Sequence, residues 1–104
     1  QGLCTSVDLT IESDMPPLVI HADSPLVAAV RKAVKAVAGV DIERIGMSGT
    51  TVCKQLLTHG IPAVGWSQEA SHQAHMANEH LALSEIPLFG RALGLAFLAL
   101  GGNV

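Results

Sequence analysis

Five side chains that can bind a metal ion lie close together in the polar segment 67–83: Glu69, His72, His75, Glu79 and His80. Imidazole nitrogen and carboxylate oxygen are ordinary zinc ligands, and a bound zinc ion activates water for the hydrolysis of amide bonds. The helical HExxH motif is absent, and the segment lacks the period that would put two of its histidines on one helix face. On spacing alone, a solvated polar loop is the better interpretation, because loop histidines usually face water.

Three helices are predicted from residues that cap helix starts and glycines that end helices. They run from Ser24 to Gly39, from Ser48 or Thr50 to Gly60, and from Ser84 to Gly101. The last helix is apolar around most of its circumference, and one thin sheet cannot cover it. We therefore expect the remainder of a larger protein or a second copy of the chain to pack against it.

Three strands are predicted before and between these helices, over residues 7–12, 42–45 and 61–66. The first alternates apolar with polar residues, as a half-buried strand does, whereas the third is almost wholly apolar, as expected for a strand covered on both faces. The order of elements favours a partial α/β sandwich whose strands are mostly parallel. Segment 67–83 is then a long loop that carries the candidate ligands.

The composition excludes several classes of partner and site. Charged residues make up 14% of the chain and the net charge is −3, so there is no basic surface to bind nucleic acid or an anionic membrane. Cys4 and Cys53 are far apart in sequence and form neither a disulfide framework nor a thiolate metal site. No export signal is visible near the N-terminus, so we expect a cytoplasmic protein. Because the sequence begins with Gln1 instead of Met, we expect it to be part of a longer product.

Several short motifs resemble those of one enzyme family, in the same order along the chain. Residues 60–66 read GIPAVGW and residues 74–80 read AHMANEH, which resembles the "GIPAV … AHxxNE" ending of M20 metallopeptidases and their acetylornithine deacetylase and succinyl-diaminopimelate desuccinylase relatives. Residues 23–27, DSPLV, match a helix start of that family, and residues 48–50, SGT, stand in the place of its Gly-Gly-Thr turn. The resemblance extends over almost the whole chain.

The resemblance implies a catalytic domain that binds two zinc ions and is interrupted by a smaller lid domain that also forms dimers. On this mapping, residues 1–14 are the last strand of the lid and dimerisation domain, and residues 15–104 are the C-terminal portion of the catalytic domain. The other metal ligands and the general-base Glu belong to earlier segments of the family's sequence, so we expect the isolated chain to be inactive. Its partners are then the rest of the catalytic domain or another copy of the chain, in a homo-oligomer.

The same mapping assigns roles to individual residues. His75 matches the last zinc ligand of the family, and Glu79 is expected to orient that ligand from a second layer. His72 and His80 are expected to face solvent. The turn Ser48-Gly49-Thr50 is expected to lie near the carboxylate of the substrate, because backbone N–H groups at a helix start bind carboxylates. A plain helix cap is an equal interpretation of this turn.

The implied function is hydrolysis of an N-acyl amino acid or a small peptide by zinc-activated water. Cobalt and manganese stay open as alternative metals, because one histidine does not select among the three. The competing hypothesis is a non-enzymatic α/β interaction or assembly module that lacks the upstream ligands. The two hypotheses differ in whether the intact gene product carries further His, Asp and Glu ligands before residue 1.

Overall fold

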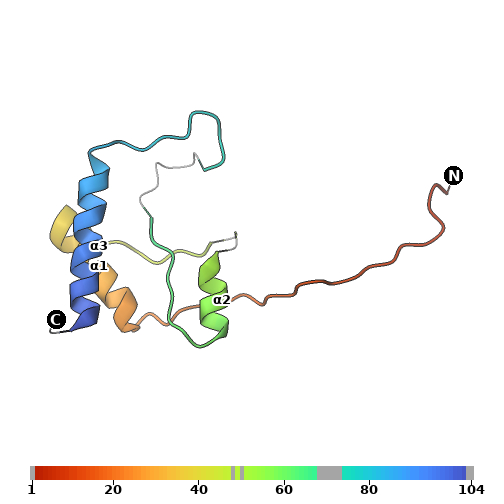
Figure 1. Ribbon diagram of the computed structural model, residues 1–104, viewed down its shortest axis with the longest axis horizontal. Coiled ribbons are helices and arrows are strands. Elements are labelled where there is room, and N and C mark those ends of the chain that lie inside the picture. Colours follow the sequence, from red (N-terminus) through yellow and green to blue (C-terminus); the bar gives the residue numbers. More distant parts are fainter. Residues whose placement is uncertain (1, 48, 50, 68–73, 103–104) are drawn as a thin grey trace.

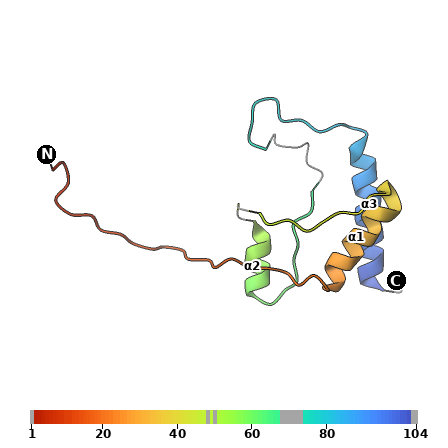
Figure 2. The same cartoon turned by 180° about the vertical axis from the view of Figure 1, so that it is seen from behind.

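Three helices make up the regular structure of this chain, as seen in a computed structural model that describes residues 2–47, 49, 51–67 and 74–102. Helix α1 spans Pro25–Ala38, α2 spans Val52–Thr58 and α3 spans Glu85–Gly101. Helices α1 and α3 pack directly against each other. Helix α2 stands apart from this pair. The extended segment that precedes α1 is the N-terminal arm, and it leads away from all three helices (Figures 1 and 2).

The predicted α/β sandwich with mostly parallel strands is wrong, because the described residues contain helices and no strand. No backbone hydrogen-bond ladder pairs the segments that were expected as strands, which are residues 7–12, 42–45 and 61–66. A strand requires a neighbour whose backbone N–H and C=O groups align with its own. Alternating or continuous apolar sequence indicates which side chains are buried, but it does not supply that neighbour.

The small core lies where α1 meets α3. It contains Val30, Ala33 and Val34 from α1 with Ala92 and Ala96 from α3, and Ala96 is only 2% exposed. Partly buried apolar residues surround this core: Leu26, Val37, Ile42, Val64 and Trp66. Helix α1 therefore buries one apolar face against α3. Because the innermost side chains are alanines and valines, the two helices approach closely but bury little area per residue.

The predicted ends of α1 are confirmed. Ser24 is the N-cap residue and Pro25 the first helical residue, although the Ser24 side chain makes no capping hydrogen bond. Gly39 ends the helix at φ 71°, and its N–H donates to the Lys35 carbonyl at 2.9 Å. This left-handed conformation is the one in which glycine avoids the steric cost that other residues incur.

Helix α2 starts at a different cap from those predicted. Thr51 is its N-cap, and the Thr51 hydroxyl accepts a hydrogen bond from the Cys53 N–H at 3.2 Å. Ser48 and Thr50, predicted as the helix opening, lie outside the described residues. At the other end, Gly60 has φ 74° and the Ile61 N–H donates to the Leu56 carbonyl at 2.9 Å, so the predicted glycine stop is confirmed.

The chain exposes far more surface than a compact domain of its size. Its accessible area is 8862 Å², whereas a compact protein of 10.8 kDa exposes about 5,500 Å². Its radius of gyration is 19.0 Å, against about 13 Å for a compact chain of this length. The excess area of roughly 3,300 Å² is larger than the ~800 Å² that one partner buries in a standard interface.

Part of this excess belongs to the N-terminal arm. The apolar side chains of its alternating segment, Val7, Leu9 and Ile11, are 84%, 86% and 71% exposed. Another part belongs to α3, where large apolar residues remain exposed outside the contact with α1: Ile86, Leu88, Leu95, Phe97, Leu98 and Leu100. The prediction that the last helix has more apolar surface than this chain covers is confirmed.

Substitution of Ala96 by Leu should destabilise the helix pair. A longer side chain at this buried position forces α1 and α3 apart, and overpacking of this kind costs about 1–3 kcal/mol. Ala99→Leu, on an exposed position of the same helix, is the matched control. Urea unfolding followed by circular dichroism measures both variants, and equal destabilisation by the two would contradict the packing described here.

The isolated chain should self-associate. The exposed apolar faces of α3 and the arm lose contact with water when two copies meet, which favours association. Sedimentation equilibrium over a range of chain concentrations measures it. A monomer that persists at high micromolar concentration would show that the exposed apolar area is too dispersed to drive assembly.

Candidate metal-binding loop

An aromatic contact joins the residue before the long polar loop to the helix that follows the loop. Trp66 directly precedes the loop and Phe89 lies in the second turn of α3, and their ring centroids are 4.8 Å apart with planes inclined at 51°. Such tilted aromatic pairs contribute attraction beyond the burial of their area. Trp66 also packs against the core between α1 and α3. The contact therefore fixes the base of the loop to the helix pair.

Within the loop, residues 74–84 form turns and no helix, as predicted. Two residues other than glycine have left-handed backbones, His75 at φ 63° and Asn78 at φ 64°. The Glu79 carboxylate accepts a hydrogen bond from the His75 N–H at 3.2 Å, and the Glu79 N–H donates to the Met76 carbonyl at 3.3 Å. The family resemblance predicts that Glu79 orients His75. In the structure the Glu79 carboxylate contacts the backbone N–H of His75.

The histidines of the described chain differ in the partners of their rings. Nδ1 of His80 lies 2.7 Å from the Asn78 carbonyl, and Nδ1 of His59 lies 2.8 Å from the Gln55 carbonyl. A carbonyl accepts only from a protonated nitrogen, so these contacts place the proton on Nδ1. The His75 imidazole, in contrast, has no hydrogen-bond partner among the described residues. Its exposed ring is thus available to an outside ligand or metal.

Apart from Glu79, the structure describes one further residue of the predicted site, Gly49. Gly49 is exposed, whereas Ser48 and Thr50 of the same turn lie outside the described residues, as do His72 and Glu69. The start of α2 and the loop lie toward the same edge of the molecule in Figures 1 and 2. No hydrogen bond between described residues connects Gly49 with the turn at 75–79.

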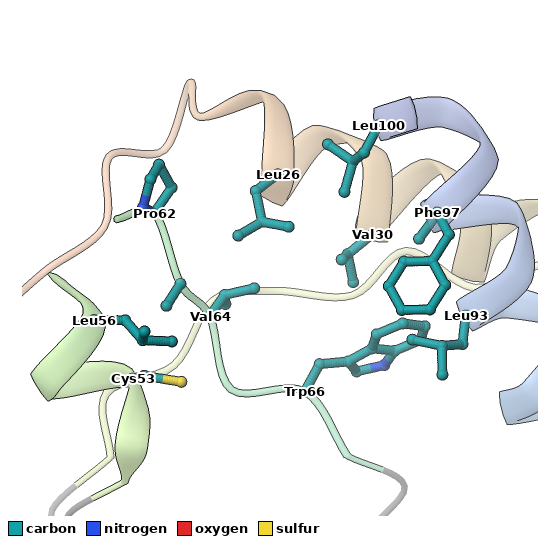
Figure 3. Close-up of a pocket in the computed structure, with 12 residues that line it drawn as sticks. Leu26, Val30, Cys53, Leu56, Pro62, Val64, Trp66, Leu93, Phe97 and Leu100 are labelled. Carbon is teal, nitrogen blue, oxygen red and sulfur yellow. The ribbon is translucent and has the colours of Figure 1, made fainter. Parts of the chain in front are cut away.

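An apolar cavity of about 300 Å³ lies between the three helices and segment 61–66 (Figure 3). Its wall includes Val30 of α1, Cys53 of α2, Trp66 and Phe97. The lining contains no carboxylate and no imidazole, so it offers neither an acid–base pair nor hard metal ligands. The cavity is better suited to take up further apolar side chains than to catalyse hydrolysis.

No three potential ligands from His, Cys, Asp and Glu come together anywhere in the part of the chain that the structure describes. A catalytic zinc ion takes three protein ligands and keeps one position for water. His75 fits one of these positions, since it is exposed and its ring is not hydrogen-bonded within the described chain. The described residues do not supply the further ligands that such a zinc ion needs.

Comparison with known protein families gives a match over residues 3–98 to the model described as peptidase family M20/M25/M40. The chain belongs to this family. Comparison with curated proteins and with solved structures gave no match. Membership in the M20/M25/M40 family associates the chain with hydrolases of the metallopeptidase type, which are generally metal-dependent. None of α1, α2 and α3 has the length and apolar character that a membrane span requires.

Asn78 is a residue of this M20 loop that sequence reasoning missed. Asn78 has a left-handed backbone and directly precedes Glu79, and its carbonyl accepts a hydrogen bond from the His80 ring. The available signal was its residue type, because Asn tolerates the left-handed region better than most residues.

The isolated chain should bind zinc weakly and hydrolyse no N-acyl amino acid. One exposed imidazole does not close a coordination sphere, so the affinity should be far below that of a site with three or four protein ligands. Zinc titration against a competing chelator and an assay with acetylated amino acids measure the two properties. Tight stoichiometric zinc binding or turnover by the pure chain would show that it carries a complete site.

Proposed function

We propose that this chain is the C-terminal part of a two-zinc amidohydrolase that cleaves N-acyl amino acids or small peptides. His75 contributes one metal ligand to it. The observation that carries this proposal is the exposed His75 imidazole, whose ring makes no hydrogen bond to a described residue. This histidine lies within the sequence that matches the M20 family, which runs from residue 3 to residue 98. Acetylated and succinylated amino acids are the substrates to test first, on the resemblance of the loop motif to deacetylases and desuccinylases.

The metal, when bound, supplies positive charge that acidifies water and polarises the amide carbonyl. The contribution of this chain is to present a neutral imidazole lone pair from a defined turn, with the Trp66–Phe89 contact holding the base of the loop. We propose that an earlier segment of the enzyme supplies the carboxylate that accepts the proton of the attacking water. Zinc is the metal that we propose, and cobalt and manganese are alternatives that metal analysis distinguishes.

The turn Ser48-Gly49-Thr50 is proposed to lie near the carboxylate of the substrate. Support comes from its place just before α2, because the first N–H groups of a helix carry partial positive charge. The Thr51 hydroxyl already accepts from the Cys53 N–H. The Cys53 N–H belongs to α2 and not to the turn, and the N–H groups proposed to bind the carboxylate are those of the turn itself.

The large exposed apolar area supports a further part of the proposal, that more protein covers this chain. We propose that residues 15–104 complete a catalytic domain and that residues 1–14 belong to a lid domain through which the enzyme dimerises. The arm supports this division, since its apolar side chains are exposed and it extends away from the helices (Figure 1). The free thiols of Cys4 and Cys53 are in keeping with a reducing, cytoplasmic location.

In the gene product that contains this chain, His75→Ala should remove a metal ligand. Bound metal should fall, and kcat/KM should decrease by orders of magnitude because the activated water is lost. His72→Ala and His80→Ala should each change stability and activity far less, within about 0.5 kcal/mol. Metal content, kcat/KM and melting temperature are measured for the three variants beside wild type.

The melting temperature separates loss of a ligand from loss of the fold. If His75→Ala keeps metal and activity while His80→Ala or His72→Ala loses them, a different histidine of the loop binds the metal. In that case the proposed register of the motif would be wrong.

A further inference from the structure

The turn that carries His75 has an unusual backbone. His75 and Asn78 both lie in the left-handed region, where residues with a Cβ atom crowd the backbone. Asn and His are both found there more often than most residues, yet the region is uncommon for any residue except glycine. Such conformations persist only where the surrounding structure holds them. The contacts that hold this turn therefore determine the position of the His75 Cα atom, from which the side chain extends.

Glu79 supplies one of these contacts. Its carboxylate oxygen Oε2 accepts from the His75 N–H at 3.2 Å, across four residues of the loop. The contact is made to the backbone of His75 and not to its ring. It thus restrains the peptide plane before the His75 Cα, and with it the direction of the Cα–Cβ bond, while both ring nitrogens stay unoccupied by described residues.

We infer that Glu79 and Asn78 are positioning residues, which hold the backbone of the turn so that the His75 imidazole points to the metal. The inference rests on the proposed function, in which His75 is a metal ligand. It differs from the usual arrangement, in which a carboxylate orients a ligating histidine by accepting its second ring N–H. Here the carboxylate acts on the peptide N–H, and the left-handed Asn78 brings that carboxylate back toward His75.

Paired substitutions test this inference in the gene product that contains the chain. Glu79→Gln keeps an oxygen that can accept from the His75 N–H, whereas Glu79→Ala removes it. Asn78→Gly keeps a residue that adopts positive φ, whereas Asn78→Val introduces a branched side chain that resists it. Glu43→Ala removes an exposed carboxylate from another segment and controls for the loss of charge.

Two readouts are measured for each variant: zinc affinity by competition with a chelator, and hydrogen exchange of the metal-free protein over residues 74–84. Glu79→Ala and Asn78→Val should each lower zinc affinity by roughly 10- to 100-fold, the range typical of groups that orient a ligand. Both should also accelerate exchange in the loop. Glu79→Gln and Asn78→Gly should each retain most of the zinc affinity and most of the protection of the loop amides from exchange.

Loss of affinity in Glu79→Gln equal to that in Glu79→Ala would overturn the inference, because the negative charge and not the backbone contact would then matter. Unchanged loop exchange in Glu79→Ala would overturn it as well. Failure of the proposed function has a different signature. In that case His75→Ala keeps its zinc, while the exchange measurements still report on the turn.

Discussion

Ala33, Ala92 and Ala96 are the most deeply buried residues of the described chain, and they lie where α1 meets α3. Small side chains allow the helices to approach closely, and the rest of the chain is arranged around this contact. The same contact limits the fold, since alanine and valine bury little apolar area. Most large apolar residues of α3 are left exposed, which supports the proposal that further protein covers this chain.

The candidate site depends on the helix pair through a short path of contacts. Trp66 packs against the core and contacts Phe89 of α3 with its ring plane tilted, so the residue that precedes the polar loop is attached to the helix pair. Beyond that base, the loop is held by local backbone contacts between His75, Asn78 and Glu79. On the role proposed for His75, the position of its ring depends on this backbone geometry, so the Glu79 carboxylate would act without touching the metal.

The helices could be predicted from the sequence because their signals are local. Gly39 and Gly60 stop helices at positive φ, and the apolar spacing from Leu26 onward marks a buried face. The strands could not be predicted, because the pattern at Val7 to Ile11 indicates burial on one side but contains no information about a pairing partner. The family motif drew attention to His75 and Glu79, whereas the backbone contact between them is a matter of turn geometry that spacing does not encode.

A direct measurement of the central claim is anomalous diffraction at the zinc edge from crystals of the gene product that contains this chain. We expect a zinc ion with a His75 ring nitrogen at about 2.0–2.1 Å, completed by ligands from segments outside residues 1–104. Zinc bound elsewhere, with His75 facing solvent, would contradict the role proposed for this loop.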